Sequence, residues 1–322
     1  MIEPIITPTP VQKIDLPDAG GNRIWIKRDD LLPFSLGGNK VRIAKAFLDD
    51  CRTSGCNAMI LYGDRRSNLC RVLSGLCRAQ NLPALMIETS EHGDEGPAPF
   101  NERMISSLGV EILKTEKEEI AQAVDEAMAR LRKRGLRPYY IYGDRFGRVN
   151  EGTAALAYAQ ASREILLWEE ETHTELDYIF TACGTGSTAA GLTAGMLDAG
   201  ARTLVVGISI SSRGQERARG AVEESVRAWF EKTGKKVPSD LSEHIHVETA
   251  YSCGGYGVRD ARVEALVREV FETSSVTLDL TYTGKALRGT LDYLDSHGIH
   301  GKNVLFLHTG GTPLWFDDLI RS

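Results

Sequence analysis

The sequence predicts an α/β protein built around parallel sheets, and three observations carry that prediction. Short β-rich runs alternate with helix-period segments almost from end to end, as in chains whose strands are joined by crossover helices. Several apolar runs end in glycine-containing turns that lead into a helical segment. With 322 residues and 42% hydrophobic content, the chain can bury two cores, so two domains are expected.

The expected strands are short runs rich in aliphatic and aromatic residues, which suit a buried sheet. In chain order they are Arg23–Lys27, Met59–Tyr62, Ala84–Ile87, Tyr139–Tyr142, Tyr178–Thr181, Leu204–Ile210 and Val304–His308. The expected helices repeat apolar residues every three or four positions. They are Lys40–Cys51, Asn68–Gln80, Ile120–Arg134, Thr153–Glu164, Thr188–Leu197, Gly214–Lys232, Asp260–Glu272 and Lys285–His297.

Two stretches interrupt this alternation. Glu91–Asn101 is acidic and rich in Gly and Pro, which predicts a surface loop that serves as a lid or as a spacer. Asp144–Gly152 is a second break. Strands flank both at ordinary spacing, so neither is a clean linker. We therefore expect a smaller domain, residues 47–153, inserted in a larger one formed by residues 1–46 and 154–322.

Composition argues against several classes of protein. The net charge of −6 comes from acids and bases mixed throughout, so no basic stripe is available to bind nucleic acid. The first residues lack a signal-peptide pattern and no apolar run is long enough to span a membrane, so a cytoplasmic protein is expected. The six cysteines lack paired CxxC spacing and are expected to be free thiols or small core residues. His244 and His246 could share one face of a strand, but no third ligand lies nearby, so no metal is expected.

The segment SLGGNKVRIAKAF contains the first candidate for chemistry. Gly37 and Gly38 allow a tight turn just before Asn39 and Lys40, where a helix is expected to start. The positive end of the helix dipole disfavours an ammonium ion there, which helps an amine to act as a nucleophile or to form an imine. An ordinary solvated lysine in a first helical turn is the simpler explanation of this segment taken alone.

The segment IFTACGTGSTAAGL has the form of a phosphate-binding loop. An apolar strand leads into glycines and hydroxyl residues, and the first N–H groups of the following helix can bind an anion. The loop consists of Gly184, Thr185, Gly186, Ser187 and Thr188. It lacks the lysine of a Walker loop and the spacing of a dinucleotide site, so a monophosphate fits better. A glycine-rich turn that only packs a helix closely on a sheet remains an alternative.

Other candidates follow further strand ends, where ligands gather in open parallel sheets. Ser67 and Asn68 are expected to cap a helix, and Arg65 and Arg66 precede them. Near the C-terminus, the candidates are Tyr256 in CGGYG, Tyr282 and Thr283 in LTYTGKA, and His308 and Thr309 in HTGG. Each of these, taken alone, is also explained by capping or by core packing.

Taken together and in order, IKRDDL, GGNK, SNLCR, GTGST, GGYG, YTGKA and HTGG resemble the D-cysteine desulfhydrase and aminocyclopropane-carboxylate deaminase family over residues 7–316. The resemblance implies the tryptophan-synthase-β-like fold of pyridoxal-phosphate enzymes of fold type II. In that fold a smaller αβ domain is inserted into a larger one. It also implies a homodimer that acts on a small amino acid.

The resemblance also implies roles for individual residues. Lys40 would hold the cofactor through an imine and shuttle protons, while Asn68 would hydrogen-bond the ring hydroxyl. Ser67, Tyr256 and Tyr282 would act on the substrate. The loop from Gly184 to Thr188, with Thr185, Gly186 and Ser187, would bind the phosphate, and Thr309 would lie beside the pyridine nitrogen.

These roles favour elimination at Cβ over ring opening. A neutral hydroxyl at Thr309 does not hold the ring nitrogen protonated as a carboxylate would, so expulsion of a leaving group from Cβ is the better outlet for a carbanion. The ring-opening deaminases of the family carry an acid after the second tyrosine, where this chain has Thr283. D-cysteine, which would give pyruvate, sulfide and ammonia, is the first substrate expected.

Other outcomes stay open. A nucleophile could capture the same intermediate in a β-replacement, or the chain could bind the cofactor without catalysis. If no cofactor binds at all, a phosphosugar or nucleotide enzyme is the alternative. Where relatives have Gln and a polar residue around the Ser67–Asn68 pair, this chain has Arg66 and Leu69. If Arg66 or Arg145 faces the pocket, the enzyme could act on a substrate that carries a second anionic group. Arg66 is accordingly a candidate substrate-binding residue.

Overall fold

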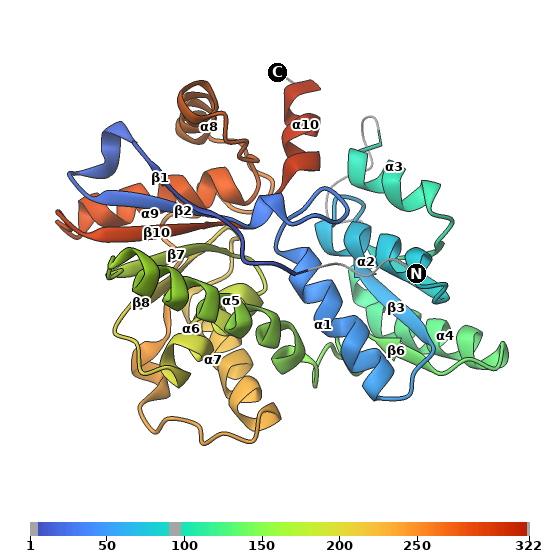
Figure 1. Ribbon diagram of the computed structural model, residues 1–322. Coiled ribbons are helices and arrows are strands. Elements are labelled where there is room, and N and C mark those ends of the chain that lie inside the picture. The colour runs from blue at the N-terminus through green and yellow to red at the C-terminus, as the bar shows by residue number, and fades with distance from the viewer. Residues whose placement is uncertain (1–5, 90–97, 321–322) are drawn as a thin grey trace.

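Residues 6–89 and 98–320 are described by a computed structural model, and within them the strands form two sheets (Figure 1). The larger sheet has the spatial order β1 (Val11–Ile14), β2 (Arg23–Arg28), β10 (Asn303–His308), β7 (Tyr178–Cys183), β8 (Leu204–Ser209) and β9 (His246–Glu248). The smaller sheet has the order β5 (Glu111–Thr115), β4 (Ala84–Thr89), β3 (Ala58–Gly63) and β6 (Pro138–Tyr140). Among these residues no helix combines the length and the apolarity needed to cross a bilayer.

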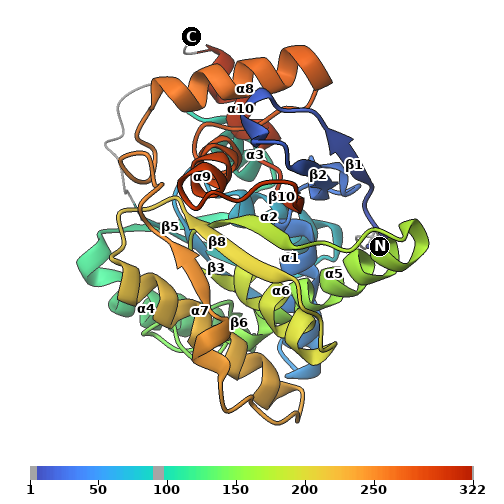
Figure 2. The same ribbon diagram turned by 90° about the vertical axis from the view of Figure 1, so that its left-hand side faces the viewer.

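Helices cover both faces of the larger sheet (Figure 2). On one side lie α8 (Ala261–Ser274) and α9 (Thr283–Ser296), and on the other lie α5 (Glu151–Thr172), α6 (Ser187–Asp198) and α7 (Gln215–Lys232). Among the described strands of this sheet, only β1 runs antiparallel to its neighbour. The run Val304–Leu307 of β10 is fully buried, as expected for a strand that packs on both faces.

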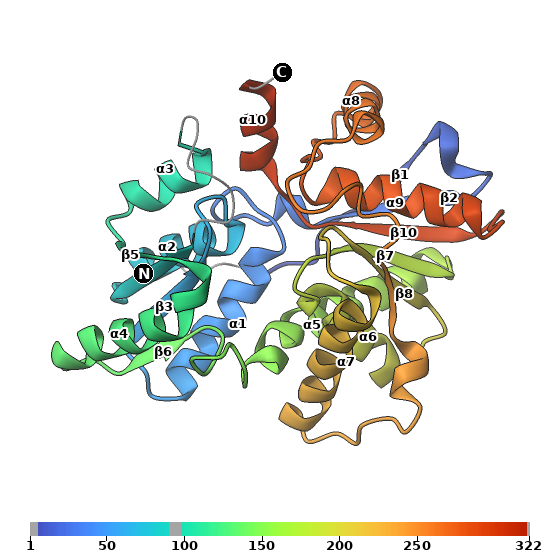
Figure 3. The same ribbon diagram turned by 180° about the vertical axis from the view of Figure 1, so that it is seen from behind.

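The smaller sheet is entirely parallel in the described residues, and its order follows from right-handed crossovers. The chain steps from β3 to β4 to β5 through α2 (Asn68–Ala79) and α3 (Phe100–Ser107). It then returns through α4 (Ile120–Lys133) to β6 on the other side of β3, which places α4 on the opposite face. Viewed from behind, α1 (Lys40–Thr53) lies between the two sheets (Figure 3).

The predicted α/β architecture with parallel sheets is confirmed, and every predicted strand and helix is present with shifted ends. The prediction missed the strands β1 and β5 and the helices α3 and α10 (Thr312–Ile320). It was wrong in placing His244 in a strand, because that residue ends a 3₁₀ turn. Most of the predicted loop Glu91–Asn101 lies outside the described residues, and its last two residues begin α3.

The limits of the two domains stay a prediction. The strands of the smaller sheet all lie between β2 and β7 of the larger sheet in the sequence.

The topology places three loops at one edge of the larger sheet. Strand order reverses between β10 and β7, because the chain runs outward from β7 through β8 to β9 and then returns to β10. Ligands in open α/β sheets bind outside the carboxyl ends of the strands at such a switch point. The residues that follow β2, β7 and β10 therefore meet there.

A buried ion cluster fixes the start of α1 against the larger sheet and α5. Arg42 pairs with Asp29 at 2.9 Å and with Glu164 at 2.6 Å, and Lys27 pairs with the same Glu164 at 2.7 Å. Tyr158 also donates to Asp29 at 2.9 Å. Burial alone would raise the pKa of Asp29, but Arg42 and Lys27 outweigh it and hold that pKa below its usual value. Two positive charges thus balance two negative ones.

Replacing Arg42 with Leu should reduce the free energy of unfolding by about 3–5 kcal/mol, because it leaves Asp29 buried without its ion-pair partner. Denaturant unfolding of the two proteins measures this. Arg227→Leu is the matched control, since Arg227 is exposed and its ion-pair partner in the described residues is Glu223, one turn away on α7. This substitution should change stability little. An equal loss in both variants would show that the cluster has no special role.

Candidate active site

Lys40 begins α1 directly after a turn of unusual backbone conformation. Ser35, Leu36, Gly37 and Gly38 all have positive φ, from 46° to 94°. A Cβ on Gly37 would collide with the backbone oxygen of Asp30, so only glycine fits there. The predicted helix start at Lys40 is confirmed.

The turn before Lys40 packs backbone to backbone on the turn after β10. Asn39 N donates to Thr309 O at 2.9 Å. Gly310 has φ of 98°, and a Cβ there would lie 2.5 Å from Gly38 Cα. Two glycine turns, more than 260 residues apart in sequence, therefore hold Lys40 close to Thr309.

The Lys40 amine has an environment suited to nucleophilic chemistry. The residue is half-buried. Within the described parts of the chain, its Nζ makes no hydrogen bond or ion pair. Burial lowers the pKa of Lys40 to about 8. A larger fraction of the amine is therefore uncharged at neutral pH than for a solvated lysine.

The predicted phosphate loop lies beside this turn. Gly186 has φ of 98° and precedes the first residue of α6, Ser187, whose Oγ lies 3.2 Å from Thr185 Oγ1. Asn39 Nδ2 donates to Thr188 Oγ1 at 3.1 Å, which joins the loop directly to the residue before Lys40. Arg213 donates to Gly184 O at 3.3 Å. Arg213 adds a positive charge next to the loop and was not selected from the sequence.

The smaller sheet contributes Ser67 and Asn68 from the loop after β3. Ser67 caps α2, since its Oγ accepts from Cys70 N at 3.2 Å, as predicted. Arg66 lies 4.0 Å from Asp318 of α10. Arg145 is exposed and pairs with Asp125 of α4, so its charge is directed to the protein surface.

The two predicted tyrosines meet each other and the loop after β3. Tyr256 and Tyr282 have their hydroxyl oxygens 2.9 Å apart, and Tyr256 also donates to Asp64 at 3.4 Å. Burial, with Tyr256 and Asp64 nearby, raises the pKa of Tyr282 well above its usual value, so it stays a neutral phenol. Lys285 donates to Gly255 O, which anchors the loop that carries Tyr256.

Asp279 holds the start of α9 and was not found from the sequence. Its carboxylate accepts from the N–H groups of Thr281, Tyr282 and Thr283 and from the Thr283 hydroxyl, at 2.6–3.1 Å. Burial raises the pKa of Asp279 to about 6. Gly311 lies against this carboxylate, since a Cβ there would collide with it. An Asp at this place could have indicated such a turn, because Asp side chains often accept from backbone N–H groups a few residues further on.

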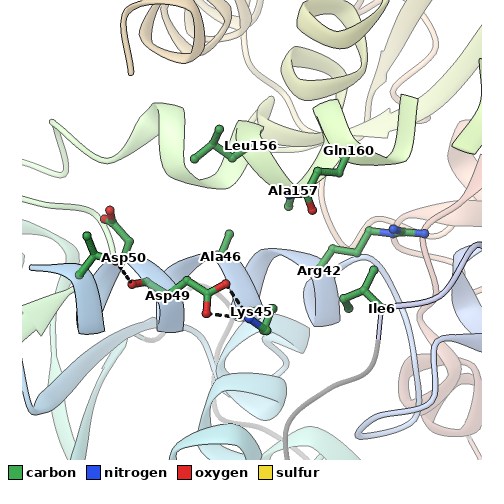
Figure 4. Close-up of a pocket in the computed structure, with 10 residues that line it drawn as sticks. Ile6, Arg42, Lys45, Ala46, Asp49, Asp50, Leu156, Ala157 and Gln160 are labelled. Atoms are coloured by element: carbon green, nitrogen blue, oxygen red, sulfur yellow. Dashed lines mark hydrogen bonds and ion pairs between the residues drawn. The ribbon is translucent and has the colours of Figure 1, made fainter. Parts of the chain in front are cut away.

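A cavity of about 250 Å³ between α1 and α5 is separate from this group of residues (Figure 4). None of the predicted site residues lines it. Its charged side chains are paired, for example Lys45 with Asp49 at 2.6 Å and Asp50 with Lys232 at 3.0 Å.

In the described residues no group of three or more His, Cys, Asp or Glu is arranged to hold a metal, and the nearest charged partner of His244 is Asp240 at 3.3 Å.

Comparison with known proteins identifies the family. Residues 2–310 match the family described as pyridoxal-phosphate dependent enzyme. A Pyrococcus abyssi protein that bears the provisional name 1-aminocyclopropane-1-carboxylate deaminase is 31% identical over 296 residues, 91% of this chain and 86% of that protein. The chain belongs to the family of pyridoxal-phosphate dependent enzymes.

Two further comparisons agree with this assignment. D-cysteine desulfhydrase of Yersinia pestis is 27% identical over 314 residues, 96% of this chain and 92% of the relative. A crystal structure of a homologue of aminocyclopropane-carboxylate deaminase superposes with a TM-score of 0.83 at 28% identity, covering 99% of this chain and 95% of the other. The predicted tryptophan-synthase-β-like fold, the cofactor and the assignment to pyridoxal-phosphate-dependent lyases of this family are thus confirmed.

The residues at this edge of the larger sheet fit pyridoxal phosphate. An aldehyde needs a nearby amine, and Lys40 Nζ is desolvated without a protein partner in the described residues. A phosphate dianion needs donors, and the start of α6, three hydroxyl residues and Arg213 surround one loop. Lys40, Asn68 and Gly184–Thr188 are the residues that would hold the cofactor, with Thr309 at the adjoining turn.

Gly310→Ala should destabilise the protein by more than the roughly 1–2 kcal/mol that left-handed strain costs by itself, because the new Cβ would overlap Gly38. It should also weaken cofactor binding, since Lys40 is displaced. Denaturant unfolding and titration with pyridoxal phosphate measure the two effects. Gly200→Ala is the control, because Gly200 has φ of 67° and open space around it. It should show the cost of left-handed strain without any steric overlap. Equal behaviour of the two variants would contradict the packing argument.

Lys40 in the cofactor-free protein should react with an amine-labelling reagent along a pH curve centred near 8. Only the unprotonated amine reacts, so the rate should rise about tenfold per pH unit below that point and then level off. Peptide mass spectrometry after labelling at several pH values measures the curve. Exposed Lys133 provides the reference in the same sample. A Lys40 rate that keeps rising with pH as steeply as that of Lys133 would show that burial does not lower its pKa.

Proposed function

We propose that this enzyme catalyses β-elimination on a small β-substituted amino acid, with D-cysteine as the first candidate. The reaction consumes D-cysteine and water and yields pyruvate, sulfide and ammonia. The observation that carries the proposal is the hydrogen bonding of Thr283, the residue that stands where ring-opening relatives have an acid. Its hydroxyl donates to Asp279 at 2.8 Å and accepts from Asp279 N at 2.9 Å, so it has no proton to offer a substrate.

The carboxylate of Asp279 does not take over the missing acid's role in this proposal. Four donors from residues 281–283 already occupy it, and it holds the turn that leads into α9. Removing such a carboxylate from its donors would leave several buried N–H groups unpaired, which costs about 1–3 kcal/mol for each. The group is therefore better suited to fixing Tyr282 than to delivering a proton.

The proposed division of labour follows from the environment of each side chain. The bound cofactor supplies an electron sink for negative charge at the substrate Cα. Lys40 Nζ, with its lowered pKa of about 8, removes the Cα proton as the general base. Ser67 and Asn68 orient the substrate and the ring from the start of α2. Tyr256 and Tyr282 face the leaving group as a neutral, hydrogen-bonded pair.

The charges around the site support a substrate without a second anionic group. Arg66 and Arg145 are the cations that could have bound such a group, but Asp318 and Asp125 lie within ion-pair distance of them. Asp64 adds a carboxylate beside Tyr256, which would repel an anion in the same place.

The homodimer remains part of the proposal and rests on the family resemblance alone.

The test is to incubate the purified enzyme with D-cysteine and to measure pyruvate and sulfide. Lys40→Ala should reduce turnover at least a thousandfold, as expected for loss of a general base that also holds the cofactor. Borohydride should fix the cofactor to the Lys40 peptide of the wild-type protein. Lys45→Ala is the matched control, because Lys45 lies on the same helix and pairs with Asp49 at the surface. A substituted alanine in place of pyruvate, or a ring-opened product from aminocyclopropane carboxylate only, would contradict elimination.

A further inference from the structure

Arg71 is a buried cation on α2 that the proposed reaction does not use. Its side chain is 1% exposed, and in the described residues it pairs with no carboxylate. Nη1 donates to Ser35 Oγ at 3.1 Å, Nη2 donates to Asn68 Oδ1 at 3.5 Å, and Nε has no partner in the described chain. Burial lowers the pKa of Arg71 to about 10. A buried charge without a counter-ion is costly, so it needs an explanation.

The nearby carboxylates are committed to other residues. Glu102 of α3 lies 2.9 Å from Arg65 Nε, and Asp318 of α10 lies 4.0 Å from Arg66. Asp64 accepts from Arg66 N at 2.8 Å and from Tyr256. Arg71 instead joins two parts of the site, since Ser35 belongs to the turn before Lys40 and Asn68 begins α2.

Asn101 makes a second contact with the Asn68 side chain. Asn101 lies on α3 and is completely buried. The Nδ2 of Asn101 donates to Arg66 O at 2.6 Å and to Asn68 Oδ1 at 3.0 Å. A backbone carbonyl can only accept, so the Asn101 atom facing Arg66 must be the nitrogen. The Asn68 atom that faces this nitrogen must then be the oxygen. A guanidinium has only donors, so Arg71 imposes the same orientation independently.

The two contacts leave Asn68 with one orientation. If its amide turned over, its N–H₂ would face the donors of Arg71 and Asn101, and two hydrogen bonds would become repulsive. Asn68 Nδ2 is consequently directed away from both residues. It has no hydrogen-bond partner in the part of the chain that the structure describes, so it is available as a donor to a ligand.

We propose that Arg71 and Asn101 are positioning residues that lock the Asn68 amide so that it donates to a negatively charged ring oxygen of the bound cofactor. The inference rests on the proposed place of Asn68 beside that oxygen. The positive charge of Arg71 polarises the amide through its carbonyl, which makes the N–H a stronger donor. Arg71 and Asn101, which do not contact the reacting atoms, thereby stabilise negative charge on the ring oxygen of the cofactor.

The proposal has a consequence at Lys40 Nζ once the cofactor is linked to it. A hydrogen bond from Asn68 stabilises negative charge on the ring oxygen, which then attracts the proton on the linked nitrogen less strongly. Without the lock the oxygen holds that proton more tightly, so the pKa of the linked nitrogen rises. A hydrogen bond to a charged group corresponds to roughly one pH unit or more.

The test is a pH titration of the visible absorbance of the holoenzyme in the absence of substrate. Arg71→Met should raise the midpoint at which the visible band is lost by about one pH unit. Asn101→Leu, which keeps the charge of Arg71, should raise it in the same direction. Arg71→Lys should restore part of the difference, because it returns a buried charge. Arg78→Leu, which removes an exposed arginine from the same helix, should leave the midpoint unchanged.

A wild-type midpoint in cofactor-loaded Asn101→Leu, or in Arg71→Met, would overturn the proposal. If Arg71→Met does not fold, Asn101→Leu decides the question by itself. The titration needs no turnover, so failure of D-cysteine as a substrate leaves its result intact. Absence of any visible band in the wild-type holoenzyme would overturn both this proposal and the role of Lys40.

Discussion

The position of the first turn of α1 is the constraint on which the site depends. Arg42 lies two residues after Lys40 and pairs at once with Asp29 and Glu164, so β2, α1 and α5 share one buried ion cluster. A residue that moved within such a cluster would leave a charge buried without a partner. The cluster therefore acts as a fixed point on the far side of the helix start. Its net neutrality keeps its own field at the nearby Lys40 amine small.

Close approach of two backbone turns completes this constraint from the other side. Gly38 and Gly310 touch without side chains, and Asn39 binds both Thr309 and Thr188. The turns after β2, β7 and β10 are thus joined through one residue, Asn39. A cofactor that spans an amine and a phosphate loop needs these separations to be fixed before it binds. The glycines allow the two turns to approach each other closely, and the ion cluster holds the start of α1 in place.

Local patterns allowed much of this to be predicted, and long-range polar contacts account for what was missed. The helix start at Lys40, the cap at Ser67 and the phosphate loop are each encoded within about ten neighbouring residues. Asn101 was placed in a surface loop because Gly and Pro precede it, yet it is fully buried against Asn68. Arg71 and Arg213 read as ordinary helix and loop residues until the fold brings Ser35 and Gly184 to them. The edge strands β1 and β5 are half polar and carry little periodic pattern.

The arrangement of charge explains why one site can hold an anionic cofactor and still keep a reactive amine. Arg213 lies at the predicted phosphate loop and Arg71 lies behind Asn68, so a cation is near each of the two places where negative charge of the cofactor is proposed to lie. Burial lowers the pKa of Lys40 to about 8, and positive charge in its surroundings can only favour its neutral form further. The carboxylates Asp64 and Asp279 are held by hydrogen bonds near the tyrosines. Positive charge is therefore concentrated where the cofactor is proposed to bind, and negative charge where the substrate's leaving group is proposed to lie, so that an uncharged thiol is favoured over a substituent with a fixed negative charge.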